Sequence, residues 1–168
     1  MTHTLFILFG ATGDLARRYI FPSLSRITGG DIDIIATGRR EYSDSEFQDF
    51  LMSNSSEFLP MGSDEFVADI RYKKIDLQNS EDFVSLSDFL TPLIRPDTHI
   101  IVYLSIGSEF FSDFITGWAQ IAPRLPQVRI VLEKPFGIDL ASARALQNQL
   151  IQVFAETDIY RIDHYVAK

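Results

Sequence analysis

The 168-residue chain has 15 basic and 23 acidic residues, which give a net charge of −8 at neutral pH. This acidic balance argues against a nucleic-acid or membrane-surface partner, because binding to phosphates needs a basic surface. The absence of cysteine excludes disulfides and thiol chemistry, and no apolar run approaches the roughly 18 residues of a membrane span. We therefore expect a single domain without a metal site or membrane segment, and the composition suits a reducing cytoplasm.

Apolar runs of strand length recur along the chain, separated by segments with helical spacing. Six such runs predict strands, at residues 5–9, 33–37, 72–75, 99–104, 129–132 and 159–162. Continuous Ile, Val and Leu runs are typical of parallel strands that are covered on both faces.

Helix signals lie between these runs. Ser43 and Glu46 form a capping box, and acidic residues follow Ser80 in the first turn of a second predicted helix. Aromatic residues recur at three- and four-residue spacing from Phe111, and Asp139 can cap a fourth apolar stripe. We interpret these stripes as core packing rather than as cofactor contacts.

The alternation of strands and helices predicts an α/β fold. Its sheet is expected to be doubly wound and mostly parallel, as in Rossmann-type dinucleotide-binding domains, and to occupy residues 1–168. Residues 53–64 are rich in Ser, Asn, Gly and Pro and are expected to form a loop within this domain.

A glycine turn follows the first predicted strand. Gly10 and Gly13 permit unusual backbone angles and close approach of a ligand, while Ala16 lets the next helix pack closely on the sheet. The N–H groups at the start of that helix can bind a pyrophosphate. A glycine turn without a ligand is the alternative.

Two arginines, Arg39 and Arg40, follow the second predicted strand. NAD-preferring domains usually place an acid there for the ribose hydroxyls, whereas this chain has Thr37 and Gly38. Because a guanidinium offers planar, bidentate donors to a 2′-phosphate, this pattern favours NADP. Pairing of one arginine with Glu41 is the alternative.

Two further motifs follow the fifth and sixth predicted strands, at the sheet edge where ligands bind. The first is Glu-Lys-Pro-Phe-Gly at 133–137, whose Lys134 can contact a nicotinamide, a sugar hydroxyl or a phosphate. The second contains three phosphate-capable donors, His164, Tyr165 and Lys168. Taken singly, these residues also fit a solvent-exposed lysine, a structural histidine and a packed tyrosine.

Together the motifs make the chain similar to the N-terminal domain of the glucose-6-phosphate dehydrogenase family. GATGDLARR, EKPFG and RIDHY-x-x-K stand in the family's order and at similar spacing. The resemblance implies an oxidoreductase of the pentose phosphate pathway that moves a hydride from C1 of glucose 6-phosphate, or a similar sugar phosphate, to NADP⁺. It also implies a second domain with the general-base histidine and a dimer surface, so residues 1–168 are expected to be inactive alone, and a homo-oligomer is left open.

The resemblance also implies roles for single residues. Those expected around the pyrophosphate are Gly10, Ala11, Thr12, Gly13, Asp14, Leu15, Ala16 and Arg17. Arg39 would meet the 2′-phosphate, Tyr103 would lie near the nicotinamide half, and Lys134 would contact both cofactor and sugar. The 6-phosphate would be held by His164, Tyr165 and Lys168. Asp163 would support the acid–base group, which makes Lys134 and Asp163 the implied catalytic residues.

Departures from the family pattern concern the substrate and the cofactor pocket. Tyr19 replaces a third basic residue, residues 105–108 read Ser-Ile-Gly-Ser instead of Ala-Leu/Met-Pro-Pro, and Ala167 replaces a common glycine. A related sugar oxidoreductase family with an EKP motif would need glycine at Leu8. A non-catalytic module that binds NADP or a protein partner is the alternative from another functional class.

Overall fold

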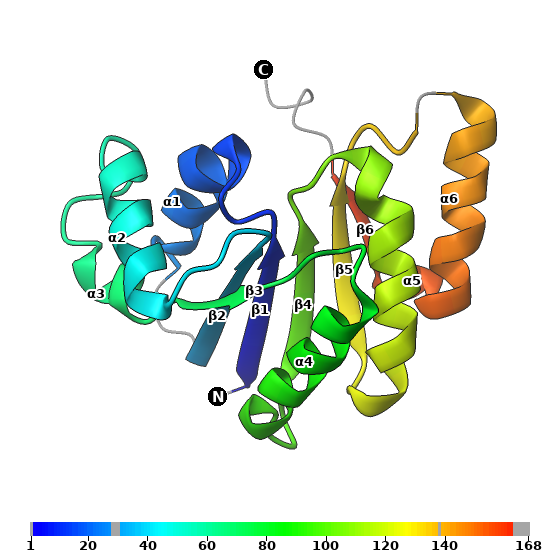
Figure 1. The fold of residues 1–168 in the computed structure, drawn as a ribbon, viewed down its shortest axis with the longest axis horizontal. Coiled ribbons are helices and arrows are strands. Elements are labelled where there is room, and N and C mark those ends of the chain that lie inside the picture. The colour runs from blue at the N-terminus through cyan, green and yellow to red at the C-terminus, as the bar shows by residue number, and fades with distance from the viewer. Residues whose placement is uncertain (1, 28–30, 138, 163–168) are drawn as a thin grey trace.

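A six-stranded sheet with helices on both faces forms the centre of the molecule (Figure 1). The computed structural model describes residues 2–27, 31–137 and 139–162. The strands lie in the order β3-β2-β1-β4-β5-β6, and all neighbouring pairs are parallel. The predicted doubly wound, Rossmann-type fold is therefore confirmed.

All six predicted strands are present. They are β1 (His3–Phe9), β2 (Asp31–Gly38), β3 (Arg71–Lys74), β4 (His99–Leu104), β5 (Val128–Glu133) and β6 (Ile159–Ile162). The strands β1 and β2 each begin earlier than the apolar runs predicted, because His3 and Thr4 pair in parallel register with Asp31 and Ile32. Hydropathy marks the buried middle of a strand and misses such ends.

The α-helices of the described residues are α1 (Phe21–Leu24), α2 (Asp44–Ser55), α3 (Asp64–Ala68), α4 (Ser80–Leu90), α5 (Phe111–Ile121) and α6 (Leu140–Val153). A single π-helical stretch, Ala16–Ile20, precedes α1. Both predicted caps are present, since Ser43 accepts from the Glu46 N–H and Asp139 accepts from the Ser142 N–H.

The loop expected at residues 53–64 is shorter than predicted. Helix α2 continues to Ser55, and α3 begins at Asp64. Ser55 is fully buried and stands four residues after the buried Leu51, so it continues the inward face of α2. The polar composition of this segment concealed that helical face.

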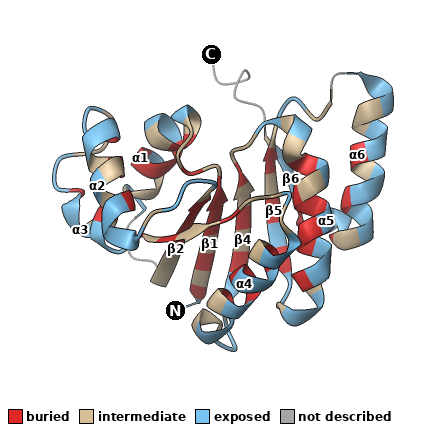
Figure 2. Ribbon diagram, viewed as in Figure 1, coloured by how far each residue is buried: buried red, intermediate tan, exposed pale blue. Residues whose placement is uncertain are grey.

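The sheet separates two apolar cores, and buried residues face it from both sides (Figure 2). The larger core lies against α4, α5 and α6, where the Phe9 ring centre is 4.9 Å from that of Phe114. The smaller core includes Phe21, Phe47 and Tyr72. The aromatic stripe beginning at Phe111 therefore packs in the core, as predicted.

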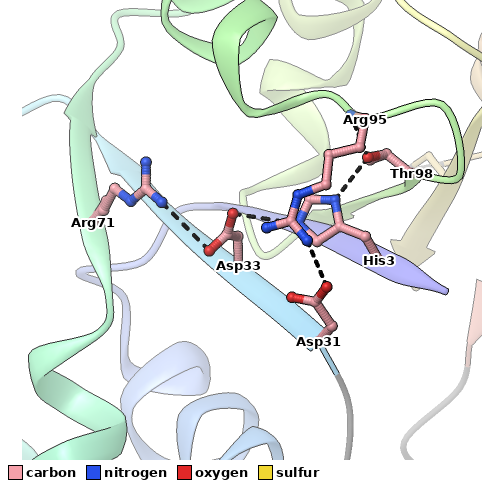
Figure 3. A network of polar contacts seen from close by, with 6 residues as sticks. All are labelled: His3, Asp31, Asp33, Arg71, Arg95 and Thr98. Carbon is pink, nitrogen blue, oxygen red and sulfur yellow. Dashed lines mark hydrogen bonds and ion pairs between the residues drawn. The ribbon is translucent and has the colours of Figure 1, made fainter. Parts of the chain in front are cut away.

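A polar network ties the amino edge of the sheet together (Figure 3). Its members are His3, Asp31, Asp33, Arg71, Arg95 and Thr98. The fully buried His3 lies 2.7 Å from the Thr98 hydroxyl through Nδ1 and 3.3 Å from the Asp33 carboxylate through Nε2. These contacts join β1 to β2 and to the turn before β4.

Candidate dinucleotide-binding site

A cleft of about 250 Å³ lies at the carboxyl ends of the strands, opposite to the polar network at their amino ends. Its walls are the turns that follow β1, β2, β3 and β4. The strand order reverses between β1 and β4, and ligands of doubly wound sheets bind at such a switch point. Of the predicted cofactor residues, the cleft is lined by Gly10, Thr12, Gly13 and Arg39.

The glycines of the first turn make a floor of backbone atoms. Gly10 has φ +82°, and a Cβ there would lie 2.1 Å from the Ser105 carbonyl oxygen. A Cβ at Gly13 would lie 3.0 Å from the Gly10 carbonyl oxygen. Side chains are thus excluded from this floor, and a ligand can approach the backbone closely. Such a cradle, ahead of helical N–H groups, suits a pyrophosphate.

The remaining residues predicted for the pyrophosphate have other surroundings. Ala11 and Ala16 are fully buried behind the cleft, and the Ala11 N–H donates to the Thr37 carbonyl at 2.9 Å. Arg17 donates to the Asn54 carbonyl at 3.2 Å, on the side of α2. These three residues therefore support the turn rather than line the cleft.

Asp14 and Leu15 also lie outside the cleft lining, at the start of the helical segment. The Asp14 carboxylate pairs with the Arg17 guanidinium at 3.4 Å and with that of Arg18 at 3.5 Å. Leu15 packs against the smaller core. Both residues therefore anchor the first helical turn.

The arginine turn after β2 borders the cleft. Arg39 and Arg40 are exposed, and the Arg39 guanidinium carbon lies 5.8 Å from the centre of the Phe110 ring. Among the ion pairs of the described residues, Glu41 joins neither arginine. The Arg39 guanidinium thus lies at the cleft beside the ring of Phe110.

Asp82 of α4 holds the wall that follows β3. Its carboxylate accepts from Lys74 Nζ at 2.9 Å and from the Asp76 N–H at 2.7 Å. Burial by itself would raise the pKa of Asp82, but these two donors outweigh it and lower that pKa below its usual value. The ionised carboxylate therefore fixes the segment that carries Asp76 and Gln78 into the cleft lining.

Tyr103 lies outside the cleft lining and is directed toward β5. Its hydroxyl donates to the Glu133 carboxylate, and its ring centre lies 6.1 Å from that of Phe6. Burial and the neighbouring Glu133 carboxylate raise the pKa of Tyr103, so the hydroxyl remains a donor at neutral pH. Tyr103 therefore braces the start of the EKPFG motif.

Lys134 follows β5 at the carboxyl edge of the sheet. Its N–H donates to the Ile162 carbonyl at 3.3 Å, and Glu133 pairs with Ile162 in register. The backbone of Lys134 thus contacts Ile162, the last residue of β6. The four predicted residues of that motif, Asp163, His164, Tyr165 and Lys168, lie outside the described residues.

The sequence-based prediction missed the cleft wall contributed by the turn after β3, and it missed Phe110 in the segment after β4. Asp76, Gln78 and Phe110 line the cleft and carried no motif. Their positions just after predicted strands were the available signal, because the carboxyl ends of neighbouring parallel strands meet at one edge.

The described residues contain no group of three or more side chains that could hold a metal ion. Their helices also include none that is both long and apolar enough to cross a membrane.

Comparison with known proteins places this cleft in a family. A family model described as "Glucose-6-phosphate dehydrogenase, NAD binding domain" matches residues 7–168. Glucose-6-phosphate 1-dehydrogenase of Zymomonas mobilis is 34% identical over 181 residues, which cover 100% of this chain and 37% of that protein. The Helicobacter pylori J99 enzyme of the same name is 37% identical, covering 96% of this chain and 38% of the relative. The chain thus spans well under half the length of these relatives.

Solved structures agree with the sequence relatives. A glucose-6-phosphate dehydrogenase determined in complex with its substrate glucose-6-phosphate superposes with a TM-score of 0.83 at 26% identity. The match covers 99% of this chain and 37% of that one. Glucose-6-phosphate 1-dehydrogenase from Mycobacterium avium gives a TM-score of 0.85 with the same identity and coverage. The chain therefore belongs to the glucose-6-phosphate dehydrogenase family and corresponds to its dinucleotide-binding domain.

Proposed function

We propose that residues 1–168 form the NADP-binding domain of a glucose-6-phosphate 1-dehydrogenase. The observation that carries this proposal is the exposed Arg39 guanidinium at the cleft, directly after Thr37 and Gly38, where an NAD-binding domain usually has an acid. A guanidinium can donate two parallel hydrogen bonds to a 2′-phosphate. With no acid at position 37 or 38 to bind the ribose hydroxyls, the site favours NADP(H) over NAD(H).

The backbone floor fits the rest of a dinucleotide. Gly10 and Gly13 keep side chains away from it, and Thr12 lines the cleft between them. Arg39 would hold the 2′-phosphate, and the floor would hold the pyrophosphate. When bound, NADP⁺ supplies a nicotinamide that accepts a hydride. The domain's own part is to fix the position of that acceptor beside the carboxyl ends of β4 and β5.

The sugar phosphate would lie where β5 and β6 end. Lys134 adjoins this place, and a solved relative binds glucose 6-phosphate. We propose that His164, Tyr165 and Lys168 hold the 6-phosphate as donors, with Asp163 supporting the acid–base group. The hydride would leave C1 of the sugar as its C1 hydroxyl loses a proton to a general base.

That base would come from beyond residues 1–168. The two histidines among the described residues, His3 and His99, are the first residues of β1 and β4, at the edge away from the cleft. We accordingly propose that residues 1–168 bind cofactor but do not turn over alone. The complete enzyme would be cytoplasmic, which suits a sequence without cysteine.

The cofactor assignment is tested by calorimetric titration of NADP(H) and NAD(H). Arg39→Ala should weaken NADP(H) binding by about 1.5–3 kcal/mol, the value of a hydrogen bond to a charged group, and leave NAD(H) binding nearly unchanged. Arg124→Ala is a matched control, because Arg124 is exposed and lies outside the cleft lining. Equal losses for both cofactors in Arg39→Ala would refute the role of Arg39.

A further inference from the structure

Tyr72 on the edge strand β3 reaches under the turn that carries the two arginines. Its side chain is 5% exposed, and its hydroxyl donates to the Arg40 carbonyl at 2.8 Å. Its own N–H donates to the Asp44 carboxylate at 2.6 Å, at the start of α2. One residue thus connects β3, the arginine turn and the following helix.

The Tyr72 hydroxyl also fills the space beside Gly38. A Cβ at position 38 would lie 2.9 Å from this oxygen and 3.6 Å from the Thr12 side chain. A Cβ contact below 3.0 Å requires an atom to shift, so a side chain at position 38 would press on the Tyr72 hydroxyl. One of the two positions where NAD-binding domains usually have an acid therefore lies against a residue from a different strand.

Neighbouring aromatic rings keep Tyr72 in this place. Its ring stacks on Phe47 with centres 4.7 Å apart and meets Tyr42 edge-on at 5.4 Å. Burial raises the pKa of Tyr72, so the hydroxyl keeps its proton and remains a donor at neutral pH. The donor cannot swing away without breaking the aromatic packing.

We propose that Tyr72 is a positioning residue for cofactor specificity, which holds the arginine turn so that Arg39 faces the cleft and which excludes an acid at position 38. The inference rests on the proposed preference for NADP(H). It assigns part of that preference to a residue that lies outside the cleft lining.

The first test compares the affinity of Tyr72→Phe for both cofactors. This change removes one hydroxyl and leaves the ring to pack on Phe47 and Tyr42. We expect the Kd of NADP(H) to rise about 5- to 10-fold, as for the loss of one hydrogen bond, and the Kd of NAD(H) to stay within about twofold. The control is Tyr160→Phe on β6, the opposite edge strand, which should change neither Kd. Equal weakening of both cofactors would indicate a merely structural role and would overturn the proposal.

The second test needs no cofactor. Gly38→Ala should lower the thermal midpoint by about 2–10 °C in the wild-type background, because the new Cβ meets the Tyr72 oxygen. In the Tyr72→Phe background the same change should cost less than half as much, since that oxygen is gone. Equal losses in both backgrounds would overturn the steric part of the proposal. If the wild-type protein bound both cofactors equally, the NADP assignment would fail, while this cycle would still decide whether Tyr72 closes position 38.

Discussion

Alanine substitutions at Gly10 and Gly62 allow two effects on the free energy of unfolding to be separated. These effects are the steric contact in the glycine turn and the strain of a positive φ. Both residues have φ +82°, a region that side chains disfavour. A Cβ at Gly62 would meet nothing within 4 Å, whereas a Cβ at Gly10 would lie 2.1 Å from the Ser105 carbonyl oxygen. Alanine at the two sites therefore adds the same backbone cost but a different steric cost.

The size of the difference follows from the Ser105 contact. To accept alanine at Gly10, the Ser105 carbonyl must move by about 1 Å. The Ser105 backbone resists this movement, because its N–H donates a hydrogen bond to the Phe9 carbonyl at 2.9 Å. The left-handed conformation costs alanine about 1–2 kcal/mol, and overpacking adds about 1–3 kcal/mol. Gly10→Ala should thus lower the free energy of unfolding by about 2–5 kcal/mol, and Gly62→Ala by only about 1–2 kcal/mol.

Urea unfolding followed by circular dichroism measures both variants. The smaller conformational freedom of unfolded alanine stabilises each by a similar amount and cancels in the comparison. Gly10→Ala should also lose affinity for NADP(H), because the displaced Ser105 borders the cleft. Equal losses of stability for the two variants would refute the argument that the turn after β1 is locked against the loop after β4.

Three further changes probe other parts of the domain. Gly13→Val should abolish NADP(H) binding in titration while the domain stays folded, since its Cβ faces the Gly10 carbonyl at 3.0 Å without a positive φ; undiminished affinity would remove the turn from the site. His3→Ala should lower the free energy of unfolding in urea by about 1–3 kcal/mol, because it leaves Thr98 and Asp33 without their partner. The Kd of NADP(H) should not change, because these contacts lie at the amino ends of the strands, away from the cleft. A changed Kd would show that the polar network and the cleft are coupled. Asp82→Asn should destabilise the domain at neutral pH. Because folding lowers the pKa of Asp82, the stabilisation by its carboxylate is present above the unfolded pKa of about 3.9 and is lost as pH falls through the lower folded pKa. The free energies of unfolding of wild type and variant should therefore converge in acid. A constant difference between them down to acid pH would exclude this linkage.

Local patterns predicted most of the fold. The strand positions, the capping box at Ser43, the N-cap at Asp139 and the aromatic stripe of α5 depend on neighbours in sequence, and all are present. The predicted start of β1 and the predicted start of the loop at residues 53–64 were wrong, because the polar residues His3 and Ser55 are buried there. Their burial depends on contacts with distant segments, which hydropathy does not reveal.

The candidate site was only partly predictable for the same reason. The sequence presents Gly10 and Gly13 as equivalent, yet only Gly10 has a positive φ and is locked against Ser105. Arg17 carries a charge suited to phosphate but bonds to α2, whereas Phe110 has no recognisable motif and lines the cleft. Side-chain direction is set by packing between segments, so a motif identifies a turn better than it identifies which of its residues face a ligand.

The amino and carboxyl ends of the strands have different chemical surroundings. At the amino edge, His3 is fully buried and bonded to Asp33 and Thr98. His99 begins β4 at that same edge. At the carboxyl ends of the strands, the cleft lining includes the Arg39 guanidinium and the Asp76 carboxylate beside the backbone of Gly10 and Gly13. Under the proposed function, His164 would bind the 6-phosphate, and the general base for C1 would come from another part of the polypeptide. Binding and proton abstraction would then be separable, with NADP(H) affinity residing in the cleft of this domain.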